Sequence, residues 1–299
     1  MDMKKLTLEK FPTISIVFPN YNGGNEPLEC LQSVRKLNYP KSKIEVIIID
    51  NNSSDGSDLE IKKHFPKVNL IKNKQNLGFA KAVNMGIKKS KGSYIFIGND
   101  DLVLEKNSLK KMVEFMFKNP RVGVLGGKIF YKSSPRKICS AGYFINHWTG
   151  NVYKSKNHNQ IYQPDWVQGC AILVPKAVFN QIGLLDENFV LLFDDFDLCT
   201  RARKKGFKIF YLPEAIFWHG ESVTVDRNKS FKYFHWYKSK FYFLIKHYPL
   251  LNLLSIFLLQ ILIITPYRAI FLQDGRLSPF LKGLSWNIMN LPKTIVARQ

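Results

Sequence analysis

Two adjacent acids follow an apolar run in the stretch Ile95–Leu104, IFIGNDDLVL. Asp100 and Asp101 are both ionised in water and repel each other unless a cation or a hydrogen-bonding ligand lies between them. A divalent metal ion is the natural third party, because Mg²⁺ and similar cations prefer carboxylate oxygens. Taken alone, two adjacent Asp residues after a strand are more often an ordinary Asn-Asp turn than a metal site.

Other candidate groups lie further along the chain. Acids occur in two more clusters: Asp50 with Asp55, and Asp194 with Asp195 and Asp197. The last cluster opens a predicted helix, where acids are favoured anyway by unpaired N–H groups, so it could be a simple cap. His219 ends a β-prone run. A carboxylate and a histidine can form part of a Mg²⁺ or Mn²⁺ site, with a diphosphate adding further oxygens.

The first 120 residues predict the elements that position these groups. Apolar β-prone runs at Ile14–Phe18, Val46–Ile49 and Val68–Ile71 each precede a polar loop, and Asn76–Ile87 has the period of an amphipathic helix. Strands alternating with helices predict a parallel, doubly wound sheet with right-handed crossovers. Because parallel strands end at one edge of the sheet, Asp50 and the Asp100 pair should lie close together there.

The second half of the chain is less regular. From Val122 to about Asp165 short runs alternate with glycines and aromatics, which predicts hairpins and loops. Trp166–Val174 predicts a core strand, and Pro175 the start of a helix. Phe207–Leu212 and Ala215–Trp218 predict two further strands.

Charge limits the classes of partner. The 299 residues include 44 Lys and Arg against 23 Asp and Glu, a formal charge of +21, which favours nucleic acid, phosphorylated small molecules or an acidic membrane. No nucleic-acid motif, Walker A motif or GxGxxG is present, so we expect no nucleic-acid partner. The four cysteines are far apart and are predicted to be reduced core residues. The N-terminus lacks an apolar segment of signal-peptide length, which predicts no secretion.

Composition changes after Asn228. Aromatic residues alternate with Lys and His up to Pro249, and no charged residue occurs from there to Tyr267. About 20 apolar residues can cross a bilayer, which predicts a single crossing at about 250–272, while an interfacial helix or a buried C-terminal helix are the alternatives. The chain is therefore predicted to divide into a globular region and a membrane-associated C-terminal region: 1–228 and 229–299.

Five blocks resemble, in order, those of the family 2 glycosyltransferases with the GT-A fold, above all their rhamnosyltransferase-like, non-processive members. The blocks are VFPNYNG, VIIIDNNSSDGS, NLGFAKAVNMGI, FIGNDDLVL and DENFVLLFDDFDLCTRARKKGF, followed by a later histidine. The resemblance covers roughly Ile14 to Ser222. It implies an α/β GT-A fold: a Rossmann-like, mostly parallel doubly wound sheet with a smaller antiparallel part. The Gln-x-x-Arg-Trp signature of processive synthases is missing, which implies single sugar additions.

The resemblance also implies roles for particular residues. Asp101 and His219 would hold Mg²⁺ or Mn²⁺, and Asp195 would be the catalytic base. Relatives often have Asn-Pro-Asp at the first site and Glu-Asp at the second, so Asp194 is the alternative base. The residues expected to bind the donor are Pro19, Asn20, Tyr21, Asn22, Asp50, Asn52, Asn76, Gly78, Lys81 and Asp100.

Taken together, we expect inverting transfer of one sugar from a UDP- or dTDP-sugar to a hydroxyl of a glycan or lipid-linked glycan. Such a reaction would serve cell-surface polysaccharide synthesis at the cytoplasmic face of an anionic membrane. One alternative is a metal-dependent sugar-phosphate nucleotidyltransferase, although PNYNGGNE lacks the basic residue expected in its loop. Another is a basic membrane- or nucleic-acid-binding protein without catalysis.

Overall fold

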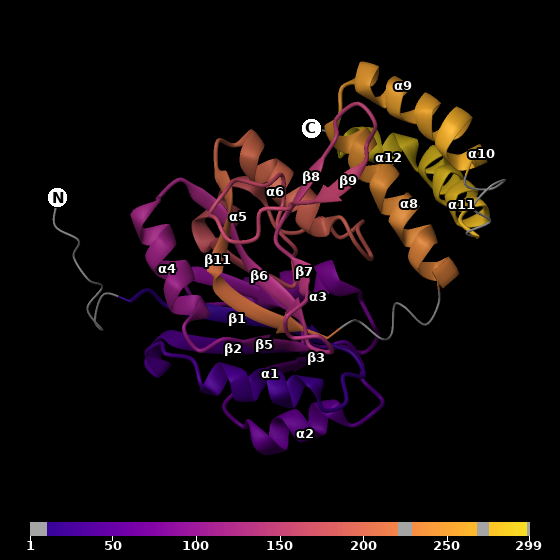
Figure 1. Ribbon diagram of the computed structural model, residues 1–299. Helices are drawn as coiled ribbons and strands as arrows, with labels where there is room; N and C mark the ends of the chain where they lie inside the picture. The colour runs from indigo at the N-terminus through magenta and orange to yellow at the C-terminus, as the bar shows by residue number, and fades with distance from the viewer. Residues whose placement is uncertain (1–10, 221–228, 268–274, 298–299) are drawn as a thin grey trace.

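The computed structural model describes residues 11–220, 229–267 and 275–297. Within these ranges nine strands form one curled sheet in the order β3-β2-β1-β4-β10-β6-β11-β5, with β7 paired to β6 (Figure 1). The strands are β1 (Ile14–Asn20), β2 (Ile44–Asp50), β3 (Asn69–Lys72), β4 (Tyr94–Gly98), β5 (Leu102–Leu104), β6 (Val122–Tyr131), β7 (Ile138–Ser140), β10 (Ala171–Pro175) and β11 (Lys208–His219). A separate hairpin pairs β8 (Tyr143–Ile145) with β9 (Val152–Lys154).

The half of the sheet formed by β1 to β4 is parallel, as the sequence predicts. β1 pairs with β2 and β4, and β2 pairs with β3, all in parallel. The register places Asn20 opposite Asp50, so the carboxyl ends of β1 and β2 lie level at the same edge. β4 is buried on both faces, which explains its continuous apolar sequence.

The other half mixes directions and curls the sheet. β10 is antiparallel to β4 and β6, β11 is parallel to β6, and β5 is antiparallel to β11. Only Asn99–Asp101 separate β4 from β5, although β5 lies at the far end of the strand order. The curl also brings Phe96 of β4 against Phe217 of β11, with ring centroids 5.6 Å apart. The loop after β4 therefore bridges two distant parts of the sheet.

Three predicted boundaries differ from the structure. The two runs Phe207–Leu212 and Ala215–Trp218 are one strand, β11, with a register shift between Leu212 and Ile216. Pro213 lies at this shift, where a residue without an N–H group is tolerated. The strand expected at Trp166–Val174 begins only at Ala171, and the irregular region after Val122 begins with the ten-residue strand β6.

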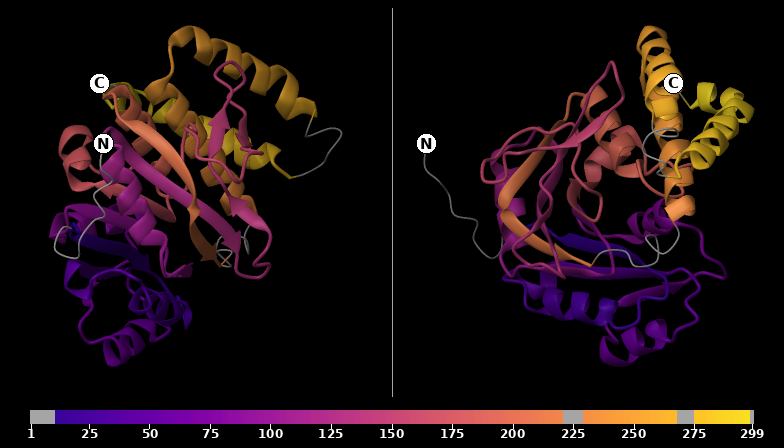
Figure 2. Two further views of the ribbon diagram at one scale, coloured as in Figure 1. Left: turned by 60° about the vertical axis from the view of Figure 1, so that its left-hand side comes forward. Right: turned by 45° about the vertical axis from the view of Figure 1, so that its right-hand side comes forward.

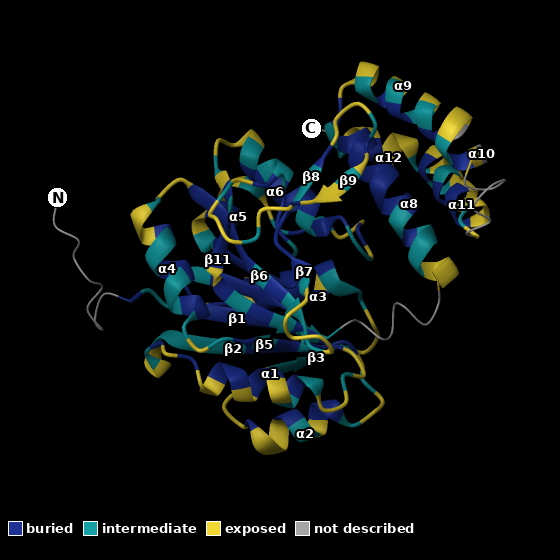
Figure 3. Ribbon diagram, in the orientation of Figure 1, coloured by how far each residue is buried: buried dark blue, intermediate teal, exposed yellow. Residues whose placement is uncertain are grey.

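Helices cover both faces of the sheet (Figures 1 and 2). Buried side chains of α1, α2 and α4 pack on one face, and those of α3, α5, α6 and α8 contribute to the core on the other. Burial follows this division for the helices that pack on the sheet, whereas α8 is buried on all sides from Tyr237 to Lys246 (Figure 3). The helices are α1 (Glu26–Arg35), α2 (Ser57–His64), α3 (Phe79–Lys89), α4 (Ser108–Lys118), α5 (Lys176–Ile182), α6 (Asp194–Lys204) and α8 (Lys229–His247).

The C-terminal helices lie on the side of the molecule opposite α1 and α2 (Figure 2). They are α9 (Leu250–Leu259), a π-helical turn (Gln260–Ile264), α10 (Thr265–Tyr267), α11 (Leu277–Met289) and α12 (Leu291–Val296). No helix in the described part of the chain is long and apolar enough to cross a bilayer. The predicted crossing at 250–272 extends beyond these residues, since 268–272 lie outside the description.

Candidate functional site

The loop after β4 meets the end of β11. Because β5 and β11 run antiparallel, His219 lies opposite Leu102, next to Asp101. Nε2 of His219 is 3.2 Å from Oδ1 of Asp101, and the side-chain amide nitrogen of Asn99 is 2.9 Å from the same Nε2. Residues about 120 positions apart are thus brought together by strand pairing alone.

Asp101 and His219 suit a divalent cation. Oδ1 of Asp101 is buried, and among the described residues no donor reaches it with hydrogen-bond geometry. A carboxylate oxygen facing an imidazole nitrogen is a donor set that Mg²⁺ or Mn²⁺ accepts. The described residues contain no group of three or more potential ligands, so a bound cation would need further oxygens, such as those of a diphosphate. The residues present therefore fit an incomplete metal site.

The raised pKa of His219 indicates that Asp101 stabilises a positive charge at this position. Burial alone would lower the pKa of His219, but the neighbouring Asp101 and Cys139 outweigh burial and raise the pKa to about 9. The carboxylate of Asp101 therefore stabilises a positive charge beside it, which a divalent cation would supply with neutral His219 as a ligand.

Asp100 points toward the first loop of the chain instead. It accepts a hydrogen bond from the backbone N–H of Tyr21, and burial followed by the charge of Asp101 raises its pKa to about 7. A Cβ on Gly23 would come within 2.8 Å of Oδ2 of Asp100 and 2.7 Å of Oδ1 of Asn20. Only glycine lets this loop approach so closely. The structure thus divides the acid pair between two neighbours, the first loop and His219.

Asp50 is fully buried and organises the loop after β2. Its Oδ1 accepts hydrogen bonds from Nδ2 of Asn20 at 2.7 Å and Oγ of Ser53 at 2.6 Å, and its Oδ2 from the N–H of Ser53. Asp55 holds the same region by accepting from the N–H of Gly24 at 2.8 Å. The structure places Asp50 at the predicted edge, inside the loop rather than on its surface. Its contact with a nucleotide base stays a prediction.

The other predicted donor residues surround this edge. Tyr21, Asn22 and Asn52 are exposed, and Pro19 and Asn20 end β1. Oδ1 of Asn76 accepts the N–H of Gly78, which has a positive φ of 79°, and Lys81 is exposed on the first turn of α3. Asn51, which the sequence analysis did not single out, connects the loop after β2 to the loop between β3 and α3. Its side-chain oxygen accepts a hydrogen bond from the amide of Asn73, and its side-chain nitrogen donates one to the carbonyl of Gly78.

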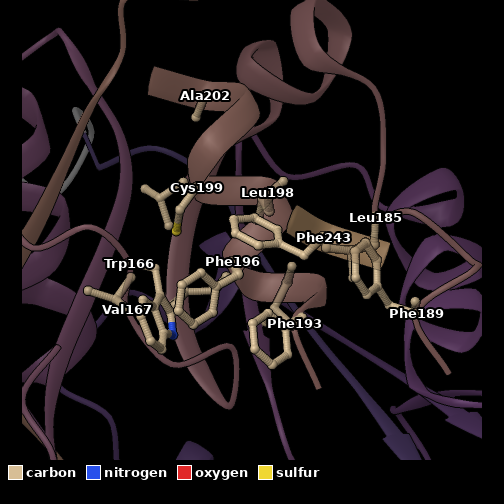
Figure 4. Close-up of a cluster of buried hydrophobic side chains, with 14 of the residues drawn as sticks. Trp166, Val167, Leu185, Phe189, Phe193, Phe196, Leu198, Cys199, Ala202 and Phe243 are labelled. Carbon is tan, nitrogen blue, oxygen red and sulfur yellow. The ribbon is translucent and has the colours of Figure 1, made fainter. Parts of the chain in front are cut away.

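Asp194 and Asp195 begin α6 behind a strained backbone. Leu192 and Phe193 have φ values of 65° and 69°, which bulky side chains rarely adopt. Aromatic packing holds them in place, since the Phe193 ring stacks on Phe196 with centroids 4.9 Å apart (Figure 4). Strain that the surrounding structure enforces is typical of functional sites.

Asp195 is held by two backbone N–H groups. Oδ2 accepts from Gly169 and Oδ1 from Phe196, each at 2.9 Å. Burial raises the pKa of Asp195 to about 6, and these two bonds oppose a larger rise. Burial, to which the charge on Asp195 adds, raises the pKa of Asp194 to about 8. The two N–H groups stabilise the ionised form of Asp195, which is therefore the member of the pair suited to act as a base.

One cavity of about 400 Å³ is lined by residues from both parts of the site. Asn99 and His219 line it together with Asp194 and Asp195, whereas Asp100 and Asp101 are not among its lining residues. Sequence reasoning missed several further lining residues: Phe79, Tyr131, Cys139, Gln168, Gly169, Cys170, Leu191, Leu192 and Lys232. Of these, Gly169 had a signal in the sequence, because a glycine inside the predicted strand Trp166–Val174 can mark a close approach of the backbone to another group. The predicted donor residues from Pro19 to Lys81 do not line the cavity.

Helix α8 braces the segment that carries the acids. Asp197 is fully buried and lies 2.7 Å from each of Arg201 Nε, Lys246 Nζ and His247 Nε2. The hydroxyl of Ser239 donates to the carbonyl of Leu191 at 2.8 Å. The contacts of α8 therefore act directly on the first turn of α6 and on the strained loop before it.

Comparison with known proteins places the chain among sugar-transferring enzymes. The model of the family described as Glycosyl transferase family 2 matches residues 15–183, more than half of the chain. A similar curated protein is the N-acetylglucosaminyl-diphospho-decaprenol L-rhamnosyltransferase of Mycobacterium tuberculosis, 24% identical over 67% of this chain and 74% of that protein. A probable glycosyltransferase of Bacillus subtilis is 24% identical over 73% of this chain and 53% of its own length.

Solved structures share the fold. A mannosyltransferase from Pyrobaculum calidifontis in complex with GDP-Man and Mn²⁺ has a TM-score of 0.58 and 15% identity, covering 96% of this chain and 86% of that one. Staphylococcus aureus TarS 1–349 has a TM-score of 0.56 and 18% identity, covering 91% and 71%. These likenesses support the predicted GT-A class of α/β fold.

Proposed function

The chain belongs to glycosyltransferase family 2, and from this premise we propose that it transfers a single sugar, with inversion, from a nucleotide-diphospho-sugar to an acceptor hydroxyl. The observation that carries the proposal is one cavity lined both by the carboxylate of Asp195 and by His219, the partner of Asp101 in the cation-suited pair. A base on one side and leaving-group stabilisation on the other are the two requirements of direct displacement at an anomeric carbon.

Asp195 is the proposed base. It would take the proton of the acceptor hydroxyl while the hydroxyl oxygen forms its bond to the anomeric carbon and the bond to the diphosphate breaks. The N–H groups of Gly169 and Phe196 aim both carboxylate oxygens and keep the group ionised. Asp194, with its higher pKa, stays protonated beside it.

Asp101 and His219 are the proposed ligands of Mg²⁺ or Mn²⁺. When bound, such an ion neutralises charge that develops on the diphosphate leaving group. Asn99 orients His219 from the side, and Asp100 joins the loop of Tyr21, where the resemblance places the ribose. The metal-containing complex of the mannosyltransferase and the donor it binds support this arrangement.

We further propose a UDP- or dTDP-sugar as donor and a glycan or lipid-linked glycan as acceptor in cell-surface polysaccharide synthesis. Support comes from the mycobacterial relative, whose name specifies a lipid diphosphate acceptor and rhamnose transfer. A location at the cytoplasmic face of the membrane stays a prediction of the sequence.

The test is a panel of UDP-, dTDP- and GDP-sugars, with release of nucleoside diphosphate as the readout. We expect one donor to be turned over, chelation to abolish turnover, and Asp195→Asn to lower it at least 100-fold with little change in donor affinity. Asp194→Asn, which replaces a neutral acid with a neutral amide, is the matched control and should retain most activity. Wild-type turnover by Asp195→Asn would exclude Asp195 as the base. Conversion of a nucleotide-sugar and added pyrophosphate to nucleoside triphosphate and sugar 1-phosphate would indicate a nucleotidyltransferase.

A further inference from the structure

The outer side of α9 carries a stripe of exposed apolar side chains. Leu250, Leu254 and Leu258 of α9 and Leu262 of the π-helical turn after it recur every four residues, and each is 49% to 76% exposed. The inner side of the same helix is buried, with Ile256 fully covered. α9 is thus apolar on both sides, although one of them faces solvent, and soluble proteins seldom expose such a stripe without a partner.

The tip of the β8–β9 hairpin lies against α9 and adds an exposed aromatic residue, Trp148, next to this helix. Asn252 Nδ2 donates to the carbonyl of His147 at 3.3 Å, and Ser255 Oγ to that of Trp148 at 3.2 Å. Two polar residues that interrupt the apolar sequence of α9 are therefore satisfied by the hairpin. Trp148 itself is 59% exposed. Tryptophan beside an apolar helix face is typical of a membrane–water interface.

A basic cavity of about 420 Å³ opens where α8 joins α9. Arg203, Lys204, His147 and His247 line it, and none of the described lining residues is acidic. Two carboxylates face this group from neighbouring elements. Asp165 pairs with Arg203, and the buried Asp197 accepts from His247.

The basic side chains that line the cavity suit an anionic ligand. Arg203 pairs with Asp165, and Nζ of Lys204 lies 3.3 Å from Nδ1 of His247 at the same cavity. A phosphodiester is an anion that such basic side chains bind. Because the cavity adjoins Leu250, a phospholipid could place its headgroup phosphate in the cavity while its chains contact the leucine stripe.

We propose that the leucine stripe of α9, Trp148 and the basic cavity form one surface that docks on an anionic phospholipid bilayer. α9 lies along the bilayer surface, and the phosphodiester of a lipid headgroup is bound next to Lys204. The proposal rests on the proposed function only in that a lipid-linked acceptor is presented at the same bilayer. Vesicle binding needs no donor sugar, so the two proposals can fail separately.

The test is flotation of the full chain with vesicles of phosphatidylcholine alone and of phosphatidylcholine mixed with phosphatidylglycerol. We expect binding to the mixed vesicles, a loss of at least about tenfold for the double variant Leu254→Asp/Leu258→Asp, and a loss of about fivefold for Lys204→Gln on mixed vesicles only. Leu59→Asp on α2, an exposed leucine on the opposite side of the molecule, is the matched control and should bind as wild type does.

The variants should keep the wild-type melting temperature and donor hydrolysis, because none of the substituted residues lines the active cavity. Equal binding by wild type and the leucine variant, or no binding of wild type to the mixed vesicles, would overturn the proposal. A wild-type dimer in light scattering that the leucine variant converts to a monomer, without vesicle binding, would assign the stripe to a second copy of the chain and overturn it as well.

Discussion

Replacing Asp197 with Asn tests whether α8 braces the base-carrying helix. The carboxylate is fully buried and accepts from Arg201, Lys246 and His247 at 2.7 Å each. Removing one partner of a buried ion pair leaves buried charge uncompensated, at a typical cost of about 3–5 kcal/mol. Lys246 keeps a second carboxylate, Asp186, at 2.7 Å, so we take the lower value of about 3 kcal/mol. At about 2–4 °C per kcal/mol this predicts a fall in Tm of about 6–12 °C.

The loss should depend on pH. Burial alone would raise the pKa of Asp197, but the hydrogen bond from His247 and the charges of Arg201 and Lys246 lower it well below the usual range. A group whose folded-state pKa is depressed stabilises the fold above its unfolded value, about 3.9 for Asp, and loses this contribution as pH falls through the folded value. The difference between wild type and Asp197→Asn should therefore be full at pH 7 and shrink below about pH 4.

Thermal melting of both proteins from pH 3 to pH 8 is the assay. Glu60→Gln is the control, because Glu60 and its partner Lys63 are both exposed and the loss of their ion pair should lower Tm only slightly at any pH. A fall in Tm at pH 7 no larger than that of the control, or a fall independent of pH, would refute the reasoning. Turnover should fall together with stability, since the first turn of α6 carries both Asp197 and Asp195.

Three further predictions concern the active cavity. Because burial raises the pKa of Asp195 to about 6 and a base must be ionised, kcat/KM should fall about tenfold per pH unit below that value, and a flat pH profile would contradict the assignment. Gly169→Ala places a Cβ 3.1 Å from Cβ of Asp195 and should lower turnover by up to about 100-fold at nearly constant donor KM, measured by steady-state kinetics. Gly23→Ala forces a Cβ to within 2.8 Å of Asp100, an overpacking of about 1–3 kcal/mol that should weaken donor binding roughly tenfold in calorimetry, whereas turnover at saturating donor should change little.

The parallel half of the fold was predictable because its signal is local. Each strand from β1 to β4 is an apolar run followed by a polar loop, and the structure has the predicted strands within a few residues. The common edge followed from the rule that parallel strands end together, and Asn20 and Asp50 are in fact paired across it. The sequence also indicated that Asp100 and Asp101 end a buried strand.

The rest depended on long-range pairing. Nothing in the sequence states that β5 pairs with β11, yet this pairing places His219 against Asp101. The two runs before His219 were separated by Pro213, so a single strand with a register shift was not predicted. Gly169 supports Asp195 through its backbone N–H group, which carries no side-chain signature. Residue types indicated the chemistry, while the curl of the sheet determined which residues meet.

The proposed boundary between 1–228 and 229–299 stays a prediction, but the contacts across it bear on catalysis. The strained φ values of Leu192 and Phe193 must be held by surrounding structure, since each costs about 1–3 kcal/mol. Ser239 of α8 donates a hydrogen bond to the carbonyl of Leu191, directly before this pair, and Lys246 forms an ion pair with Asp197, two residues after Asp195. The helix that begins the C-terminal region thus contacts the segment that carries the proposed base on both sides of Asp195. Since α9 follows α8 after two residues, docking of α9 on a bilayer would fix the orientation of the cavity relative to a membrane-bound acceptor.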